Sequence, residues 1–317
     1  MKNKAMVLGI IMICLGGFAS EGWAAKEFIS LLTCGTAGVY FPLGGGIARI
    51  WNSKVADVNA TAETSGCSVV NLRLMEQGQA SAAICQNDAV YFAANGLKFF
   101  EKKATKARGV LMLYDEHLHI ATTKQSGIKK IEDLKGKRVR IGFPGSIATE
   151  NALILLEAYG MSEKDMKAYQ MSLADAFEQL KDGNIDVLIE PTGAPAAGFL
   201  DVAHARDMVL LPVDREHAEK ITKKYPFLSP TVFPAGTYKG TNQDLPTLAV
   251  TCMLVASSDM PTDLVYKLTK SIFQNLNILG ESHVKGKLVK METALKGMPI
   301  PLHPGAEKYY REVGKIK

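Results

Sequence analysis

After its first 24 residues, the sequence has no apolar run that approaches the roughly 20 residues of a membrane-spanning helix. We therefore expect no membrane segment within the main part of the chain. Residues 1–24 have another pattern, in which Lys2 and Lys4 precede an apolar run over residues 5–18. This pattern is typical of a cleaved signal peptide that directs export. An uncleaved anchor helix is the alternative, although residues 5–18 are short for that role.

The sequence also has no metal-binding or redox spacing of cysteines. Four cysteines follow the predicted signal peptide, Cys34, Cys67, Cys85 and Cys252, without a CxxC pair or the His/Cys pattern of a zinc site. We expect no metal and no cofactor. Buried thiols are the expected state, although an exported protein can carry a disulfide. Cys34 and Cys85 both end predicted strands, so they would be the neighbours to bridge.

Basic clusters of the kind that bind nucleic acid are missing. The chain has 37 Lys and Arg against 32 Asp and Glu, a formal net charge of +5, and these residues are scattered along it. No basic stripe alternates with aromatic residues, so we expect no nucleic-acid partner. The mild positive excess is compatible with a protein that holds an anion, and equally with one that holds nothing charged.

No nucleophile is paired with a general base in the sequence pattern. Cys67 lies at a predicted helix start, where the pKa of a thiol can fall, but no histidine lies near it in the predicted topology. We expect the six histidines to be structural and the protein not to be an enzyme. A transferase that depends on Cys67 is the enzymatic alternative.

The chain does contain a regular alternation of short β-like runs with amphipathic helical stretches, which is typical of α/β proteins. The chain is longer than a single hydrophobic core usually supports, which indicates two lobes. The predicted strands are 28–34, 58–63, 81–85, 110–114, 117–122, 138–142, 187–190, 208–212 and 247–257. The predicted helices are 41–53, 68–77, 88–95, 148–159, 174–181, 262–279 and 306–313, and 226–246 is predicted to be a long loop.

The order of these elements predicts one lobe interrupted by another. Residues 25–119 and 250–317 would form lobe I, and residues 120–249 would form lobe II. The runs 110–114 and 117–122 would form the first crossing between the lobes and the run 247–257 the return crossing, so that they make a hinge with the ligand between facing strand ends. A single large α/β domain is the alternative.

Polar turns follow several of the predicted strands. The loop over residues 34–40 joins the first strand to the first helix, where backbone N–H groups suit a carboxylate or phosphate. Its glycine spacing matches neither a dinucleotide fingerprint nor a P-loop. The same loop is equally well explained as an ordinary tight turn between a strand and a helix. Residues 64–68, 86–88 and 142–150 form similar turns, so helix N-termini from both lobes would face one anion.

These loops resemble those of the TAXI family, the solute receptors of one branch of the tripartite ATP-independent periplasmic (TRAP) transporters. The likeness is carried by GTAGVYFPLG at 35–44, TSGCS at 64–68, QNDAVY at 86–91, PAGTYKG at 234–240 and PLHPGA at 301–306. It implies a type II periplasmic-binding-protein fold, with two α/β lobes joined by a β-strand hinge and the ligand cleft between them. Where that family has Gly-Ser-Gly-Thr-Glu, this chain has Gly145-Ser146-Ile147-Ala148-Thr149-Glu150.

The resemblance also implies a function. It implies a periplasmic receptor that captures a small anionic or zwitterionic metabolite, a carboxylate or amino acid of the glutamate, glutamine or 2-oxoglutarate type. Such a receptor would act as a monomer and deliver the ligand to a TRAP permease. Carried onto this chain, the ligand-binding residues would be Gly38, Tyr40, Thr64, Ser68, Gln86, Asn87, Ser146, Thr149, Thr192 and Gly193. A receptor of an ABC importer and a periplasmic ligand-sensing subunit are the alternatives.

Overall fold

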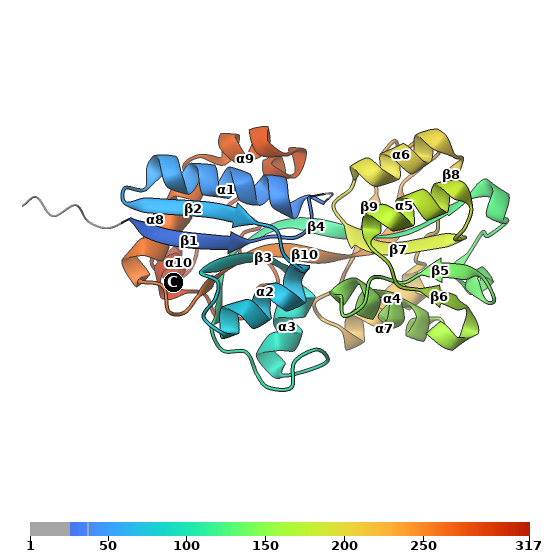
Figure 1. The fold of residues 1–317 in the computed structure, drawn as a ribbon, viewed down its shortest axis with the longest axis horizontal. Coiled ribbons are helices and arrows are strands. Elements are labelled where there is room, and N and C mark those ends of the chain that lie inside the picture. Colours follow the sequence, from blue (N-terminus) through green and yellow to red (C-terminus); the bar gives the residue numbers. More distant parts are fainter. Residues whose placement is uncertain (1–25, 37) are drawn as a thin grey trace, which may run out of the picture.

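Two α/β lobes lie side by side in the computed structural model (Figure 1). The structure describes residues 26–36 and 38–317, so the predicted signal peptide lies outside the described residues. The first lobe contains strands β1 (Glu27–Leu32), β2 (Val58–Glu63) and β3 (Ala82–Gln86). Its helices are α1 (Tyr40–Lys54), α2 (Cys67–Glu76), α3 (Asn87–Asn95), α8 (Thr262–Phe273), α9 (Leu276–Ser282) and α10 (Pro304–Glu312).

The second lobe is built from the middle of the chain. Its strands are β5 (Arg138–Arg140), β6 (Lys167–Tyr169), β7 (Val187–Thr192), β8 (Met208–Leu210) and β9 (Ser229–Phe233). Its helices are α4 (Ile147–Ala158), α5 (Leu173–Asp182), α6 (Ala197–Ala205) and α7 (Arg215–Lys224). Short 3-10 turns occur at Lys124–Ser126, Ile131–Leu134, Glu163–Asp165 and Val284–Leu288.

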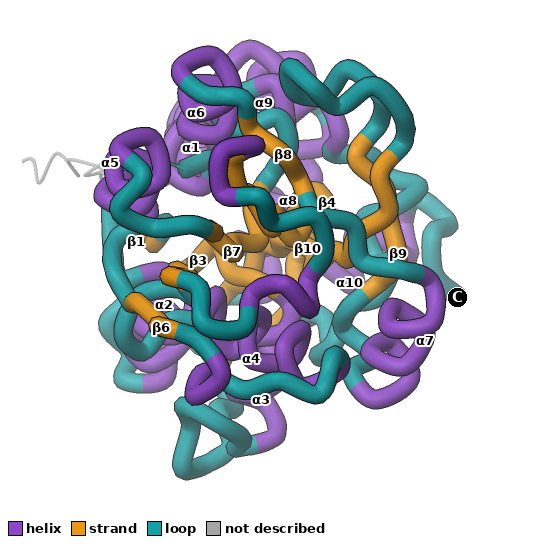
Figure 2. The backbone as a smooth tube through the Cα atoms, turned by 90° about the vertical axis from the view of Figure 1, so that its right-hand side faces the viewer, coloured by secondary structure: helices purple, strands orange, loops and turns teal. Residues whose placement is uncertain are grey.

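Two long antiparallel strands, β4 (Ala107–Thr123) and β10 (Leu245–Ser257), run from one lobe into the other. In the first lobe β10 pairs with β3, and in the second lobe β4 pairs with β7 from His117 to Thr122. The sheet order is β2-β1-β3-β10-β4-β7-β5-β6, with β8 on β4 and β9 on β10. Viewed along the long axis of the molecule, helices lie around these strands (Figure 2).

Strand residues alternate between the two faces of the sheet, as the pleat requires. Ile29 and Leu31 of β1 pack with α1, α8 and α10, whereas Leu32 packs with α2 and α3. In the second lobe, Leu188 of β7 faces α5 and α6, and Ile189 faces α4. Helices therefore cover both faces of the sheet in each lobe.

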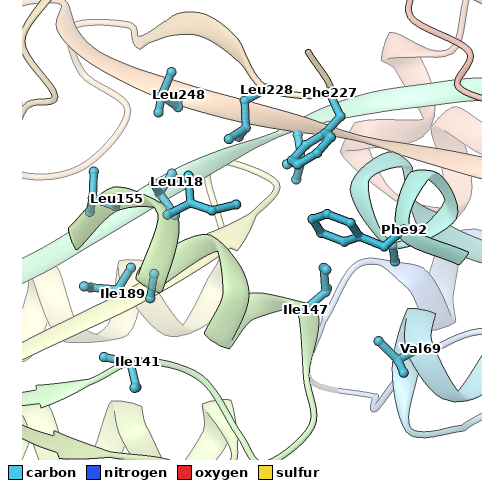
Figure 3. Packing of buried hydrophobic residues seen from close by; sticks show 14 of the residues in the cluster. Val69, Phe92, Leu118, Ile141, Ile147, Leu155, Ile189, Phe227, Leu228 and Leu248 are labelled. Atoms are coloured by element: carbon cyan, nitrogen blue, oxygen red, sulfur yellow. The ribbon is translucent and has the colours of Figure 1, made fainter. Parts of the chain in front are cut away.

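One hydrophobic cluster continues from the first lobe into the second (Figure 3). Phe92 of α3 contacts Phe227, which precedes β9, with ring centroids 5.2 Å apart in an edge-to-face arrangement. Such aromatic pairs contribute about 1 kcal/mol beyond their burial. Leu155 of α4 and Ile189 belong to the same cluster. Apolar contacts therefore connect the lobes on the side away from α1.

Most predicted elements are confirmed, and two predictions were wrong. The predicted loop 226–246 contains β9, which pairs with β10 as an edge strand. Pro230 does not prevent this pairing, because an edge strand tolerates a residue without a backbone N–H. The predicted helix 262–279 breaks into α8 and α9 at Asn275, whose side-chain amide donates to the carbonyl of Ser271 at 2.8 Å. This local bond competes with helix continuation. The predicted ranges also omit the short strand β6 and the helices α6 and α7.

The expected state of the cysteines also needs correction. Cys34 and Cys67 form a disulfide with their Cα atoms 4.4 Å apart, whereas Cys85 and Cys252 are buried free thiols. The parallel pairing of β1 with β2 places the loops that follow them side by side. Cys85 instead points into the core on the α2 side. The Cys34–Cys85 pair that we considered is therefore wrong.

We predict that the disulfide contributes about 4 kcal/mol to the free energy of unfolding, because it closes a loop of 33 residues in the unfolded chain. Guanidinium unfolding with and without reductant measures this difference. The Cys34→Ser/Cys67→Ser variant is the control and should be insensitive to reductant. Thiol titration of denatured, unreduced protein expressed without residues 1–24 should find only the two thiols of Cys85 and Cys252. Four reactive thiols before reduction would contradict the pairing.

Candidate functional site

A cavity of about 500 Å³ lies between the two lobes. The first lobe contributes the loops after β1, β2 and β3, and the second lobe contributes the start of α4, the start of α5 and the end of β7. The lining residues are Cys34, Gly35, Thr36, Gly38, Val39, Tyr40, Ser65, Gly66, Cys67, Ser68, Val69, Gln86, Glu116, Phe143, Ser146, Ile147, Ala148, Ser172, Leu173, Ala174, Glu190, Pro191 and Thr192. The Cys34–Cys67 disulfide is therefore part of the wall.

Six of the ten sequence-predicted site residues lie on this lining. They are Gly38, Tyr40, Ser68, Gln86, Ser146 and Thr192. They come from both lobes, as the sequence pattern predicts, and their role in ligand binding stays a prediction. The other four, Thr64, Asn87, Thr149 and Gly193, are not among the residues that line the cavity.

Asn87 connects backbone segments instead of lining the cavity. Its side-chain amide donates to the carbonyl of Phe227 at 3.0 Å, and its oxygen accepts from the backbone N–H of Thr251 at 3.0 Å. Both sides of the amide are therefore occupied within the protein. Thr64 is exposed at the end of β2.

Thr149 lies under the loop that precedes α4, and its hydroxyl donates to the carbonyl of Phe143 at 3.1 Å. That loop can approach because residue 142 is glycine. A Cβ at Gly142 would lie 2.6 Å from the backbone nitrogen of Thr149, and the φ of +135° also favours glycine. Gly193 is similarly close-packed, since a Cβ there would lie 3.1 Å from Lys285 and from Tyr114.

Two helix N-termini reach the cavity from opposite lobes. Ser146 caps α4, and its Oγ accepts from the backbone N–H of Phe143 at 3.2 Å. At the start of α2, Ser65 accepts from the backbone N–H of Cys67 at 3.1 Å. Ile147 and Val69 add apolar surface beside them, and both are visible in Figure 3. The cavity therefore combines backbone donors at its rim with apolar walls.

A buried carboxyl group, that of Glu116, lies where β4 crosses from the first lobe to the second. Glu116 is 3% exposed and accepts three hydrogen bonds. Gln86 donates to it at 2.6 Å, Tyr114 at 3.1 Å and Tyr40 at 3.2 Å. Burial raises the pKa of both tyrosines, so their hydroxyls keep the protons that they donate.

Burial raises the pKa of Glu116 to about 8, and the three donors only partly offset this effect. Glu116 is not among the sequence-predicted site residues. A signal was present, because Asp115 and Glu116 interrupt the apolar crossing strand between residues 110 and 122. Alternation could not decide which of these two acids points inward. Asp115 instead accepts from the hydroxyl of Thr251 at 2.9 Å.

The second acidic side chain of the lining, Glu190, is compensated by Arg140. Arg140 is fully buried and donates to Glu190, to the carbonyl of Ile189 at 3.0 Å and to the carbonyl of Met171 at 3.2 Å. Arg140 does not line the cavity. The guanidinium of Arg140 is therefore fully used by these partners, and its charge compensates that of Glu190 in the cavity wall.

Within the described residues, no group of three or more His, Cys, Asp and Glu side chains is arranged to hold a metal. No histidine lies on the cavity lining. His119 is buried between aromatic rings, and burial lowers its pKa to about 3. In the same part of the chain, every helix is too short or too polar to cross a membrane.

The chain belongs to the NMT1-like family, whose family model matches residues 31–314. This is a family of periplasmic solute-binding proteins rather than enzymes. Membership in the TAXI family does not follow from this match.

Several solved structures share the fold. SsuA from Xanthomonas axonopodis pv. citri, bound to MOPS, matches with a TM-score of 0.54 and 14% identity over 91% of this chain and 85% of that chain. MatC from Rhodopseudomonas palustris, with bound malate, matches with a TM-score of 0.58 and 11% identity over 91% and 97%. A TctC solute-binding protein from Polaromonas matches with a TM-score of 0.50 and 13% identity over 91% and 98%. The predicted two-lobed periplasmic-binding-protein fold is therefore confirmed.

We predict that Glu116 makes the free energy of unfolding fall as pH rises. Between pH 4.5, the usual value for Glu, and about 8, the folded protein holds a proton on Glu116 that the unfolded chain has released. Unfolding therefore releases a proton in this range, and a rise in pH favours it. Asp88, whose pKa burial raises to about 7, adds a change of the same sign.

Chemical denaturation at pH 5 and pH 8 tests this prediction. Wild-type protein should lose on the order of 1–3 kcal/mol more than Glu116→Gln over this interval. Glu63→Gln, at an exposed position on the end of β2, is the control and should behave like wild type. Equal pH dependence of wild type and Glu116→Gln would contradict the assignment.

Proposed function

We propose that this periplasmic solute-binding protein captures a small carboxylate or amino acid by hinge closure and delivers it to a TRAP membrane permease. One observation supports the proposal most strongly: the cavity is lined by strand-end loops of both lobes beside the two strands that cross between them. A cavity of about 500 Å³ has the size of a small-molecule site.

The proposed lobes are residues 25–119 with 250–317, and residues 120–249. Each boundary falls within a crossing strand, near Glu116 in β4 and near Val250 in β10, which are paired in register. Rotation about this pair would move α4 and β7 relative to α1 and α2 and so open or close the cavity.

Several polar contacts connect the lobes, among them the hydrogen bond from Asn87 to the carbonyl of Phe227. Asn151 of α4 donates to Asp88 of α3 at 2.6 Å, and Lys98 pairs with Glu150 at 2.6 Å. The second pair is partly exposed, so it contributes little to stability. Closure would have to preserve or rearrange these contacts together with the apolar contact of Phe92 with Phe227.

We propose that the carboxylate of the ligand binds at the rim, where Ser68 and Ser146 lie at the N-terminal ends of α2 and α4. Charge-assisted bonds from backbone N–H groups contribute roughly 1.5–3 kcal/mol each. The permease type is carried by the sequence resemblance, since receptors of ABC importers would use the same two-lobed capture.

A variant that fills the cavity tests whether this is the ligand site. Ala174 lies on the lining yet is exposed, so Ala174→Trp should fold normally and obstruct the cavity. Thermal-shift screening of ligand-stripped mature protein against amino acids, dicarboxylates and oxoacids should give a hit for wild type and at least tenfold weaker binding for Ala174→Trp. Ala205→Trp, at the exposed end of α6, is the matched control and should bind like wild type. Equal binding by both tryptophan variants would contradict the assignment of the cavity.

A further inference from the structure

The charged side chains of the cavity are all acidic. Among the described residues that line it, there is no Arg, Lys or His, and the two ionisable carboxyl groups are Glu116 and Glu190. Arg140 compensates Glu190 through an ion pair. Glu116 receives hydrogen bonds only from uncharged groups. The lining therefore presents hydrogen-bond acceptors that are negatively charged or neutral. It has no basic side chain that could pair with an anionic ligand.

A second acceptor lies next to Glu116. Gln86 is 6% exposed and lines the cavity, and its Nε2 is used by Glu116. Its Oε1 is buried and has no hydrogen-bond partner among the described residues. An unpaired buried acceptor is unfavourable, so a ligand that brings donors to this end would satisfy a group that the protein leaves open.

The surrounding charges do not change this balance. The basic side chain of Lys285 interacts electrostatically with Glu116, but it packs against Gly193 and does not line the cavity. Burial lowers its pKa, and Glu116 and Asp115 partly restore it. Asp88 is a further acid that raises the pKa of Glu116.

The rest of the wall is predominantly apolar. Val39 and Val69 come from the first lobe, and Phe143, Ile147 and Leu173 come from the second. A second carboxylate, such as the side chain of glutamate or the far end of 2-oxoglutarate, would have no cation to meet there. An aliphatic or aromatic body would instead bury its surface against these side chains.

We infer that Glu116 and Gln86 form an acceptor subsite for the protonated amine of a ligand whose remaining body is apolar. This inference rests on the proposed function, because it takes the cavity as the solute site. It narrows the ligand to apolar amino acids and related amines, and it disfavours dicarboxylates and oxoacids.

Matched pairs of ligands test this selectivity. Calorimetry of ligand-stripped mature protein would compare leucine with 4-methyl-2-oxopentanoate, phenylalanine with phenylpyruvate, and glutamate with 2-oxoglutarate. We expect leucine or phenylalanine to bind at least tenfold more tightly than its oxoacid and than glutamate. Binding of the oxoacids or dicarboxylates as tightly as the amines would overturn the subsite and leave the receptor function standing. Absence of binding by every compound would overturn both.

Variants of Glu116 separate the amine contact from folding. Glu116→Gln should weaken binding of the preferred amine at least tenfold and change the affinity of its oxoacid little, whereas Glu63→Gln should change neither. If Glu116→Gln fails to fold, Glu116→Asp keeps the charge and should show a smaller, selective loss for the amine. An equal loss for amine and oxoacid would mean that Glu116 is only structural.

Release of the Glu116 proton on ligand binding distinguishes a direct contact with the ligand from a purely structural role of Glu116. Glu116 is surrounded by Tyr40, Tyr114 and Gln86, with Asp88 and Lys285 beyond them, and burial raises its pKa to about 8. An ammonium group favours the ionised carboxylate, so binding near pH 7 should release a proton to the buffer. Calorimetry in two buffers of different ionisation enthalpy measures this release. Its absence for a tightly bound amine would overturn the contact.

Discussion

The arrangement of the first lobe depends on one buried carboxyl group. Glu116 lies on the strand that joins the lobes, and burying it without partners would be strongly unfavourable. The three donors come from three elements: Tyr40 from the start of α1, Gln86 from the end of β3 and Tyr114 from β4 itself. Satisfying this group therefore fixes two of the strand-end loops against the crossing strand, and these loops form one side of the cavity.

This constraint couples the proposed site to the proposed hinge. Glu116 pairs in register with Val250 of β10, while the next residue of β4, His117, already pairs with Thr192 of β7. A ligand group that contacts Glu116 would thus touch the point where the strands change lobes. The second lobe then adds the start of α4, where Ser146 and Ile147 face the same cavity. Ligand binding to Glu116 at the inner end of the cavity and closure of the lobes at its rim would therefore be coupled.

The sequence predicted the fold class, the crossing strands and six residues of the cavity lining, because strand–helix alternation and strand-end loops are local signals. It failed where local signals compete or where distant groups decide. The break at Asn275 depends on one side-chain hydrogen bond, and β9 forms only because β10 offers an edge. The side-chain amide of Asn87 is of a type that often binds ligands, yet it forms hydrogen bonds with the backbone of Phe227 and Thr251. Glu116 could not be recognised because its inward orientation depends on partners up to 76 residues away.

The most direct test is a crystal structure of the mature protein purified from the periplasm with its own ligand, or soaked with the tightest-binding compound. We predict electron density in the cavity between α2 and α4, with a ligand nitrogen within hydrogen-bond distance of Glu116 and an apolar body against Val69 and Ile147. A ligand bound outside this cavity would contradict the proposed site. A ligand inside it with a carboxylate beside Glu116 would contradict the acceptor subsite alone.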